Sequence, residues 1–455
     1  MNPRILFAVL TACYSSATLA WSSADPFATG AVHEHREPTC DTARIQHPLT
    51  LQDVVELALC HNPQTHALWA NSRAQAAQLG ISLASYLPTL SANGNTARNQ
   101  SQTGTAASTA NTGQSLGLTA SYLLFDFGGR AASLENAQQL LIAANATGDA
   151  SLQALWLSTA QAYFALRSAR ASVAATRSAE AAAQESLAAA QARYLSGSAT
   201  PADRMQAQTA HSQATLNRIT AEGNAATATG TLANLMGLDA DQPLDLAEDA
   251  DASPDPQAEQ AIGQLIAEAR RKRPDLAAAE AQIKAAEAQV DAVHASGRPS
   301  ISLNANAFRN TNSGTPDTRG NSIGVSLNIP LFTGMRTTYQ ARAAEAQVAS
   351  RAADRDRIAN QIALDVWKAY QALLTGSQAL RTADDLVASA EQSERMTLGR
   401  YKAGLGNLID LLTAQSTLAS ARQQRITARY NFLASRFALA QAIGELDLTQ
   451  TTLNH

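Results

Sequence analysis

The most restrictive feature of this 455-residue sequence is that its landmarks occur twice. The segment 193–203 carries Arg, Tyr, Gly and Asp at the same four places as the segment 400–410, an offset of 207 residues. Asn62-Pro63 has a counterpart in Arg273-Pro274, 211 residues later. A chain with such a tandem duplication must build one structural unit twice, so the whole fold has to be derived from one repeat.

Long helices are predicted on either side of each Arg-Tyr segment. From about Arg130 to Leu195 there is no proline and one glycine, Gly148, while apolar residues recur at three- and four-residue steps. At 1.5 Å per residue this helix would be roughly 100 Å long. With a return helix from Pro201 to about 236, it predicts an αα-hairpin whose tip is the Arg-Tyr-Gly segment. A second hairpin has its long helix ending at Lys402 and its return helix at 408–443.

Four shorter segments alternate between apolar and small polar residues, a pattern typical of β-strands with one apolar face. These segments are 89–96, 115–122, 300–307 and 322–329, with loops expected at 97–114 and 309–320. Their length of about ten residues suits a tilted strand that crosses a membrane. Four strands cannot close a barrel and would leave backbone groups unpaired in lipid, so the chain must oligomerise. Three copies would supply twelve strands. The alternative, a soluble β-sandwich, provides nothing for the long helices to pack on.

The N-terminus has the pattern of an export signal, with Arg4 before the apolar run 5–10 and a small-residue cleavage site at Ala20. Acylation at Cys13 is the alternative. The predicted organisation is a signal peptide at 1–20, an extended arm at 21–48, a first repeat at 49–237, an acidic linker at 238–257, a second repeat at 258–446 and a C-terminal tail at 447–455. In an exported chain, Cys40 and Cys60 are expected to form a disulfide, with two free thiols as the alternative.

Charge and motifs exclude several classes of function. The net charge of −4 offers no basic surface for nucleic acid. The sequence contains no catalytic motif, phosphate-binding loop or clustered metal ligands, so we expect neither an enzyme nor a cofactor.

In its two-repeat order, its Arg-Tyr-x-x-Gly…Asp tips and its Leu-Phe turns after the second strand of each repeat, the chain resembles the TolC-like outer-membrane channels of Gram-negative bacteria, over residues 49–446. The resemblance implies a mixed α/β membrane protein with long coiled-coil hairpins and four transmembrane β-strands per protomer. It further implies a homotrimer with a 12-stranded barrel and an α-helical periplasmic tunnel. The implied partners are a periplasmic adaptor, an inner-membrane transporter and the lipid of the outer membrane.

The resemblance also assigns roles at the tips. Asp410 corresponds to an acidic ring at the tunnel entrance, and Tyr401 and Asp203 to links that hold the closed state. Thr413 replaces a second acidic residue, and Gly406 replaces an arginine, so the closure network is expected to differ. From the residues alone, Thr200 with Asp203 and Asn407 with Asp410 also have the spacing of helix caps, and both roles can coexist.

The tips are also where the family meets its adaptor. The contact candidates are Leu195, Gly197, Gly404, Leu405, Gly406 and Leu408. The three glycines are expected to adopt positive φ. Tyr122, Phe125, Phe308 and Phe332 lie near strand ends and are candidates for membrane-interface anchors, with core burial as the alternative.

The functional hypothesis is a passive exit duct of a tripartite export system, carrying a protein such as a toxin in type I secretion. The outer-membrane component of a multidrug efflux pump is the alternative. A periplasmic coiled-coil protein that never inserts is the alternative of another class.

Overall fold

The computed structural model describes residues 25–29, 48–102, 104, 108–247, 262–313 and 315–446. The predicted signal peptide, most of the N-terminal arm, Cys40 and the C-terminal tail lie outside these residues. The chain divides into two compact units. Of the described residues, unit 1 contains 25–29 and those within 70–145 and 278–354, and unit 2 contains those within 48–69, 146–277 and 355–446.

The two halves of the chain contain the same six elements in the same order: two helices, two strands, a long helix and a return helix. The first half comprises α2 (Leu51–His61), α3 (Pro63–Ala84), β1 (Thr89–Ser101), β2 (Thr109–Phe125), α4 (Gly129–Leu195) and α5 (Pro201–Leu235). The second comprises α6 (Ile262–Lys272), α7 (Pro274–Ser296), β3 (Ser300–Asn312), β4 (Thr315–Asn328), α8 (Arg336–Lys402) and α9 (Leu408–Ala442). None of the described helices combines the length and the apolar character needed to cross a bilayer.

Proline and capping residues set the helix starts. Pro63 and Pro274 each open a helix directly after a shorter one ends, because proline lacks the amide hydrogen that a continuous helix needs. Thr50 caps α2: its hydroxyl accepts from the Asp53 amide at 3.3 Å, and the Asp53 carboxylate accepts from the Thr50 amide at 2.8 Å. The capping box predicted from the sequence is therefore present.

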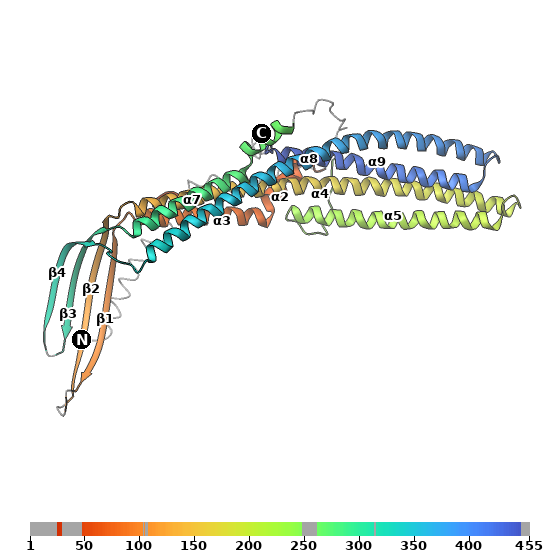
Figure 1. Ribbon diagram of the computed structural model, residues 1–455. Coiled ribbons are helices and arrows are strands. Elements are labelled where there is room, and N and C mark those ends of the chain that lie inside the picture. Colours follow the sequence, from red (N-terminus) through yellow and green to blue (C-terminus); the bar gives the residue numbers. More distant parts are fainter. Residues whose placement is uncertain are drawn as a thin grey trace. The chain divides into compact units, whose positions relative to one another are not determined.

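The sheet of unit 1 is antiparallel, in the order β1-β2-β3-β4 (Figure 1). The strands run further than predicted. Most of the segments expected to be loops, 97–114 and 309–320, continue the ladders, for example through Gln100 opposite Ala110 and Arg309 opposite Arg319. The prediction ended the strands where the apolar side chains ended, whereas main-chain pairing continues through residues that are polar on both faces.

The two faces of the sheet differ in chemistry. One face carries Asn, Ser, Thr and Gly, and its side chains bond across strands: Ser121 Oγ lies 3.0 Å from Asn304 Oδ1, and Asn304 Nδ2 donates to Ser326 Oγ at 2.9 Å. The other face carries Leu90, Leu118 and Ile323, all more than half exposed in the single chain.

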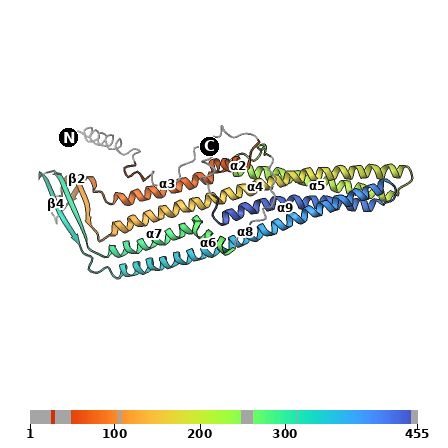
Figure 2. The same ribbon diagram turned by 90° about the horizontal axis from the view of Figure 1, so that it is seen from above.

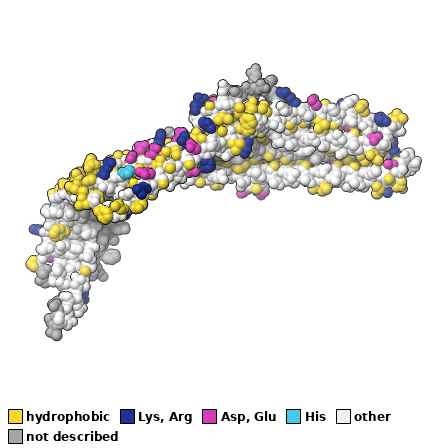
Figure 3. Space-filling view, in the orientation of Figure 1, with side chains coloured by type: hydrophobic (Ala, Val, Ile, Leu, Met, Phe, Trp, Pro, Cys, Tyr) yellow, Lys and Arg dark blue, Asp and Glu magenta, His cyan; other side chains and the backbone are white. Residues whose placement is uncertain are grey.

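The register corrects one prediction about the aromatic residues. Phe308 alternates with the apolar residues of β3 and pairs with Gly320 on the asparagine face, where a Cβ on Gly320 would come within 2.8 Å of its ring. Phe308 therefore does not lie on the apolar face, where a membrane-interface anchor would be expected. Tyr122 pairs with Leu303 on the apolar face, and Phe125 and Phe332 are 49% and 77% exposed. Figure 3 shows hydrophobic side chains gathered where the strands of unit 1 join its helices.

Within unit 1, small residues let the helices approach closely. Ala76 and Leu79 of α3 pack against Ala137 and Leu141 of α4. Asn136 of α4 donates to a backbone carbonyl of α7 at 2.7 Å.

The core of unit 2 includes a segment that was predicted to be linker. Leu244 and Leu246 are buried among Leu49, Tyr163 and Leu232. Leu246 forms a parallel bridge with Leu49, closed by two backbone bonds of 2.8 Å. The segment 238–257 stays the predicted connection between the repeats, but its acidic and proline-rich composition did not indicate that Leu244 and Leu246 reach the core.

Each return helix ends at a glycine packed against the proline break of its own repeat. Gly237 has φ +70, and a Cβ there would meet the His61 carbonyl oxygen at 2.5 Å. Gly444 has φ +77, and its Cβ would lie 3.0–3.3 Å from Lys272 and Arg273. The backbone conformation and the close approach both require glycine at these sites.

Cys60 is 7% exposed and disulfide-bonded. Its partner lies outside the described residues, so the Cys40–Cys60 pairing stays a prediction.

Candidate functional site

The tip of the first hairpin joins α4 to α5 through a glycine and a capping box. Gly197 has φ +76, and the amides of Gly197 and Ser198 donate to the carbonyls of Tyr194 and Arg193 at 3.0 and 2.9 Å. Thr200 then caps α5: Asp203 N donates to its hydroxyl at 3.2 Å, and the Asp203 carboxylate accepts from Thr200 N at 2.9 Å. These bonds to Thr200, from its backbone first and then its hydroxyl, lower the pKa of Asp203.

The second tip has the same backbone but a different cap. Gly404 has φ +76, and Leu405 N donates to the Arg400 carbonyl at 2.9 Å. Asn407 Oδ1 accepts from Asp410 N at 2.7 Å. In the part of the chain that the structure describes, the Asp410 carboxylate does not accept a hydrogen bond from the Asn407 amide. The expected reciprocal cap is therefore only half formed.

This difference separates the two aspartates chemically. The carboxylate of Asp203 is held in its own cap, whereas that of Asp410 is exposed. Asp410 lines a shallow hollow of about 240 Å³ between α8 and α9, together with Ser393, Thr397, Thr413 and Thr417. The hollow contains one carboxylate among hydroxyl groups, which suits a hydrated cation or water better than an apolar group.

Tyr401 was predicted to take part in a link at the tips, but its partner, Arg193 of the other hairpin, was not predicted from the sequence. Arg193, at the end of α4, places its guanidinium 4.2 Å from the ring centroid of Tyr401, at the end of α8. Its Nη2 also donates to the Tyr401 carbonyl at 2.6 Å. Tyr401 is 5% exposed, so this cation–π contact is largely shielded from water and stronger than a surface one.

A small apolar cluster surrounds this link. Leu187, Ala190 and Ala207 from the first hairpin pack with Tyr401, Leu408 and Leu411 from the second. A short distance along the helices, Ser186 Oγ donates to Gln415 Oε1 at 3.1 Å. The two hairpins of one chain are thus joined at their tips by a cation–π contact, hydrogen bonds and apolar packing.

The two repeats use their tip tyrosines differently. Tyr194 is covered by Arg204 of its own hairpin, at 4.8 Å from the ring centroid. The residue that corresponds to Arg204 in the second repeat, 207 positions later, is Leu411. Tyr401 therefore has no such arginine in its own hairpin, and Arg193 of the first hairpin lies over its ring instead. Identical motifs in the sequence concealed this divergence, because the deciding residue lies one helical turn beyond each tip.

The predicted contact candidates fall into two groups. Leu195 and Leu405 are 83% and 75% exposed at the tips. Leu408, by contrast, is 4% exposed inside the cluster and cannot meet a partner directly.

Gly406 also differs from the expectation, because it is not among the glycines with positive φ. A Cβ there would lie 3.2 Å from Tyr401 N and 3.3 Å from Arg400 Cβ, so a larger residue at position 406 requires a shift of a few tenths of an ångström.

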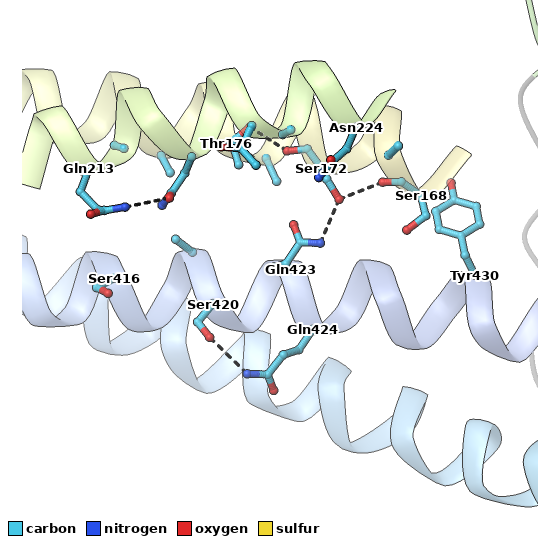
Figure 4. Close-up of a pocket in the computed structure, with 18 of the residues that line it drawn as sticks. Ser168, Ser172, Thr176, Gln213, Asn224, Ser416, Ser420, Gln423, Gln424 and Tyr430 are labelled. Atoms are coloured by element: carbon cyan, nitrogen blue, oxygen red, sulfur yellow. Dashed lines mark hydrogen bonds between the residues drawn. The ribbon is translucent and has the colours of Figure 1, made fainter. Parts of the chain in front are cut away.

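A polar groove of about 1070 Å³ runs between α4, α5 and α9 of unit 2 (Figure 4). Its lining is mostly Ser, Thr, Gln, Asn and Ala, with Phe164, Leu412 and Tyr430, and includes no charged side chain. Gln423 of α9 crosses it to donate to Ser172 of α4 at 2.9 Å (Figure 4). Amides and hydroxyls can bond to water, so the groove is suited to a hydrated path or a polar partner helix.

Ion pairs join the two helices within each hairpin, which run alongside each other in Figures 1 and 2. Arg218 lies 2.7 Å from Glu180, and Arg177 lies 2.8 Å from Glu222, between α4 and α5. Arg422–Glu391 and Arg425–Asp384 do the same between α8 and α9, at 2.9 and 2.6 Å. The charges therefore fasten each hairpin, while the groove between hairpins stays uncharged. The described residues hold no group of three or more His, Cys, Asp and Glu suited to a metal ion.

Comparison with known proteins agrees with this architecture. The family model "Outer membrane efflux protein" matches residues 54–238 and again 265–445. Protein CyaE of Bordetella pertussis is 31% identical over 405 residues, covering 88% of this chain and 84% of that protein. The toluene efflux pump outer membrane protein TtgC of Pseudomonas putida is 28% identical over 412 residues, covering 88% and 83%.

Solved structures show the same fold. A membrane protein from Pseudomonas aeruginosa superposes with a TM-score of 0.76 at 25% identity, covering 87% of this chain and 93% of that one. The CmeC outer membrane channel of Campylobacter jejuni gives a TM-score of 0.78 at 18% identity, covering 88% and 87%. The chain therefore belongs to the outer membrane efflux protein family, the TolC-like channels of the Gram-negative outer membrane.

Proposed function

We propose that the protein is the exit duct of a tripartite export system, working as a homotrimer with a 12-stranded barrel and a helical tunnel. The observation that carries this proposal is the open sheet. Among the described residues, β1 and β4 each pair with a strand on one side only, and one sheet face is apolar. In lipid, an unpaired strand edge costs several kcal/mol for each backbone group, so the edges must be paired by further copies of the chain. Three copies complete the barrel that the family resemblance implies.

The hairpin tips are proposed as the periplasmic gate and the docking rim for an adaptor. Tyr401, held by Arg193, and Asp203, held in its cap, would keep the tips in place. Asp410 would face the entrance as one of three carboxylates, with Thr413 beside it. Leu195 and Leu405, exposed beside Gly197 and Gly404, supply the apolar contacts that an adaptor would cover.

For the cargo, we favour a protein delivered by an ATP-driven inner-membrane transporter, as in type I secretion. This choice rests on the sequence, where cleavage near Ala20 gives a non-acylated N-terminus. Efflux of small toxic compounds is the second candidate, because the chain aligns with the toluene efflux protein TtgC over 88% of its length.

The duct is tested by measuring mass and conductance together. Protein purified from outer membranes in detergent should have the mass of three chains and form discrete ion channels in a planar bilayer. A monomer that stays soluble without detergent would instead support the periplasmic coiled-coil alternative.

The cargo is tested separately in a deletion strain. Loss of a specific protein from the medium, without a change in resistance to toluene or antibiotics, is the expected result. Sensitivity to these compounds with an unchanged set of secreted proteins would assign the chain to an efflux pump.

A further inference from the structure

The apolar face of the sheet ends abruptly in arginine at the end where the hairpin loops lie. Following the register, the row Leu90, Ala120, Ala305 and Ile323 is succeeded by the row Ala92, Leu118, Ala307 and Asn321. The next row contains Arg309 directly opposite Arg319, beside Leu116. The asparagine face has no charge at this height, where Phe308 lies opposite Gly320 and Asn310 opposite Thr318.

The two arginines leave an excess of positive charge. Like charges directly opposite each other on neighbouring strands repel, which destabilises the pair unless an anion lies between them. Asp317 binds Arg309 at 2.9 Å, with the two side chains 47% and 67% exposed. Arg319 is exposed, and no ion pair is drawn to it from any residue that the structure describes. The Asp317 carboxylate thus pairs with Arg309 only, and among the described residues the positive charge of Arg319 has no ion pair.

The position of this row matches one edge of a membrane. From Leu327, near the helices, to Arg319 the strand advances eight residues, or about 27 Å at 3.4 Å per residue. With a strand tilt of about 40°, this corresponds to a height of about 21 Å, close to the ~25 Å apolar band of outer-membrane barrels. If the helices lie in the periplasm, as the proposed function requires, Arg309 and Arg319 lie at the outer leaflet.

We propose that Arg309 and Arg319 form a binding site for the phosphate groups of the phosphorylated glycolipid in the outer leaflet, on the outer wall of each protomer. A planar guanidinium matches phosphate oxygens with two parallel hydrogen bonds, and a phosphate between two arginines would remove their repulsion. The neighbouring apolar rows, with Leu118 and Ile323, would contact the acyl chains of the same lipid. The site rests on the proposed function, because that function sets which end of the sheet faces outward.

The test measures equilibrium binding of purified lipid A to the assembled protein in detergent. Arg309→Gln with Arg319→Gln should weaken binding about tenfold or more, as expected for the loss of charge-assisted hydrogen bonds. The double lysine variant keeps the charge but loses the paired hydrogen-bond geometry, so its affinity should lie between those of the wild type and the double glutamine variant. Arg395→Gln, an exposed arginine on α8, removes one charge far along a helix and should bind like the wild type.

Dephosphorylated lipid A should bind the wild type weakly, and its affinity should be the same for the double glutamine variant. Equal lipid A affinity in wild type and that variant would overturn the site. So would vesicles of phosphatidylglycerol that bind as tightly and show the same arginine dependence, since the outer-leaflet glycolipid would then not be the ligand. Single-channel conductance of the same samples distinguishes the two levels. Channels without arginine-dependent lipid binding reject only this inference, whereas a wild type that forms no channels rejects the duct.

Discussion

At the scale of single residues, Arg193 carries more of the tip structure than its sequence context suggests. It lies in a motif that occurs twice, yet only this copy reaches across to the other hairpin. Its counterpart Arg400 is exposed at the second tip. The difference provides a matched pair of arginines for testing the gate.

Arg193→Ala should favour the open state of the tips. Losing a shielded cation–π contact and a hydrogen bond should weaken closure by one or two kcal/mol, roughly a fivefold to thirtyfold shift in the open-to-closed ratio. Single-channel recording measures this ratio directly. Arg400→Ala should leave it unchanged, and an equal effect of both substitutions would remove Arg193 from the gate.

Asp203→Asn should loosen the first turn of α5. Because the pKa of Asp203 is lowered in the folded chain, its contribution to stability is complete above the pKa of the unfolded chain. It is lost as the pH falls through the lowered value. The protection factors of the amides near Thr200 against hydrogen exchange should therefore fall on acidification in the wild type and be less pH-dependent in the variant. An unchanged pH profile would contradict the capping role.

At the scale of elements, two features determine how each repeat is built: the glycine that ends the return helix and the alternation of the strands. Gly237 and Gly444 are pressed against the preceding proline break, whereas Gly197 and Gly404 have the same sign of φ with nothing within 4 Å. Gly237 and Gly444 therefore need glycine both for the positive φ and for the close approach, whereas Gly197 and Gly404 need it only for the positive φ.

Gly237→Ala should destabilise the protein more than Gly197→Ala does. Both pay about 1–2 kcal/mol for a left-handed backbone, and Gly237→Ala adds a clash with the His61 carbonyl. Urea denaturation of the two variants would show the difference as a lower midpoint. Equal midpoints would mean that α2 moves away at little cost.

The sheet faces can be tested with adjacent residues. Ala120→Arg puts a charge on the apolar face in the row halfway between Leu327 and Arg319, where it should cost about 2–4 kcal/mol near the centre of a bilayer and reduce assembled channels in the outer membrane. Thr119→Arg, at the neighbouring residue on the asparagine face, should assemble and alter only conductance and ion selectivity. Assembly is measured by heat-modifiable mobility in gels. If the variant on the asparagine face assembled less well than the variant on the apolar face, the assignment of the two faces would be wrong.

At the scale of the whole molecule, the proposed trimer would bring three copies of each tip together. A single exposed Asp410 is a weak cation site, but three carboxylates around one entrance would create a combined field. The hydroxyls of Thr397, Thr413 and Thr417 line the same hollow as the carboxylate and make it polar.

Asp410→Ala should weaken block of the channel by multivalent cations added on the periplasmic side, by about tenfold or more if the ring acts together. Asp203→Ala should have little effect on block, since its carboxylate is held in the cap. Unchanged block in Asp410→Ala would place the constriction elsewhere.

The sequence by itself determined the duplication, the order of elements, the strand faces and the position of both tips. These features follow from periodicity, proline, glycine and capping residues, which act over one or two turns of chain. The extent of the strands and the burial of Leu244 and Leu246 depended on tertiary structure, because backbone pairing and core contacts join segments far apart in the sequence. The same reason hid the contact between Arg193 and Tyr401, 208 residues apart. Local chemistry specified each hairpin, and only the packing of one hairpin on the other decided which of two identical motifs holds the tips together.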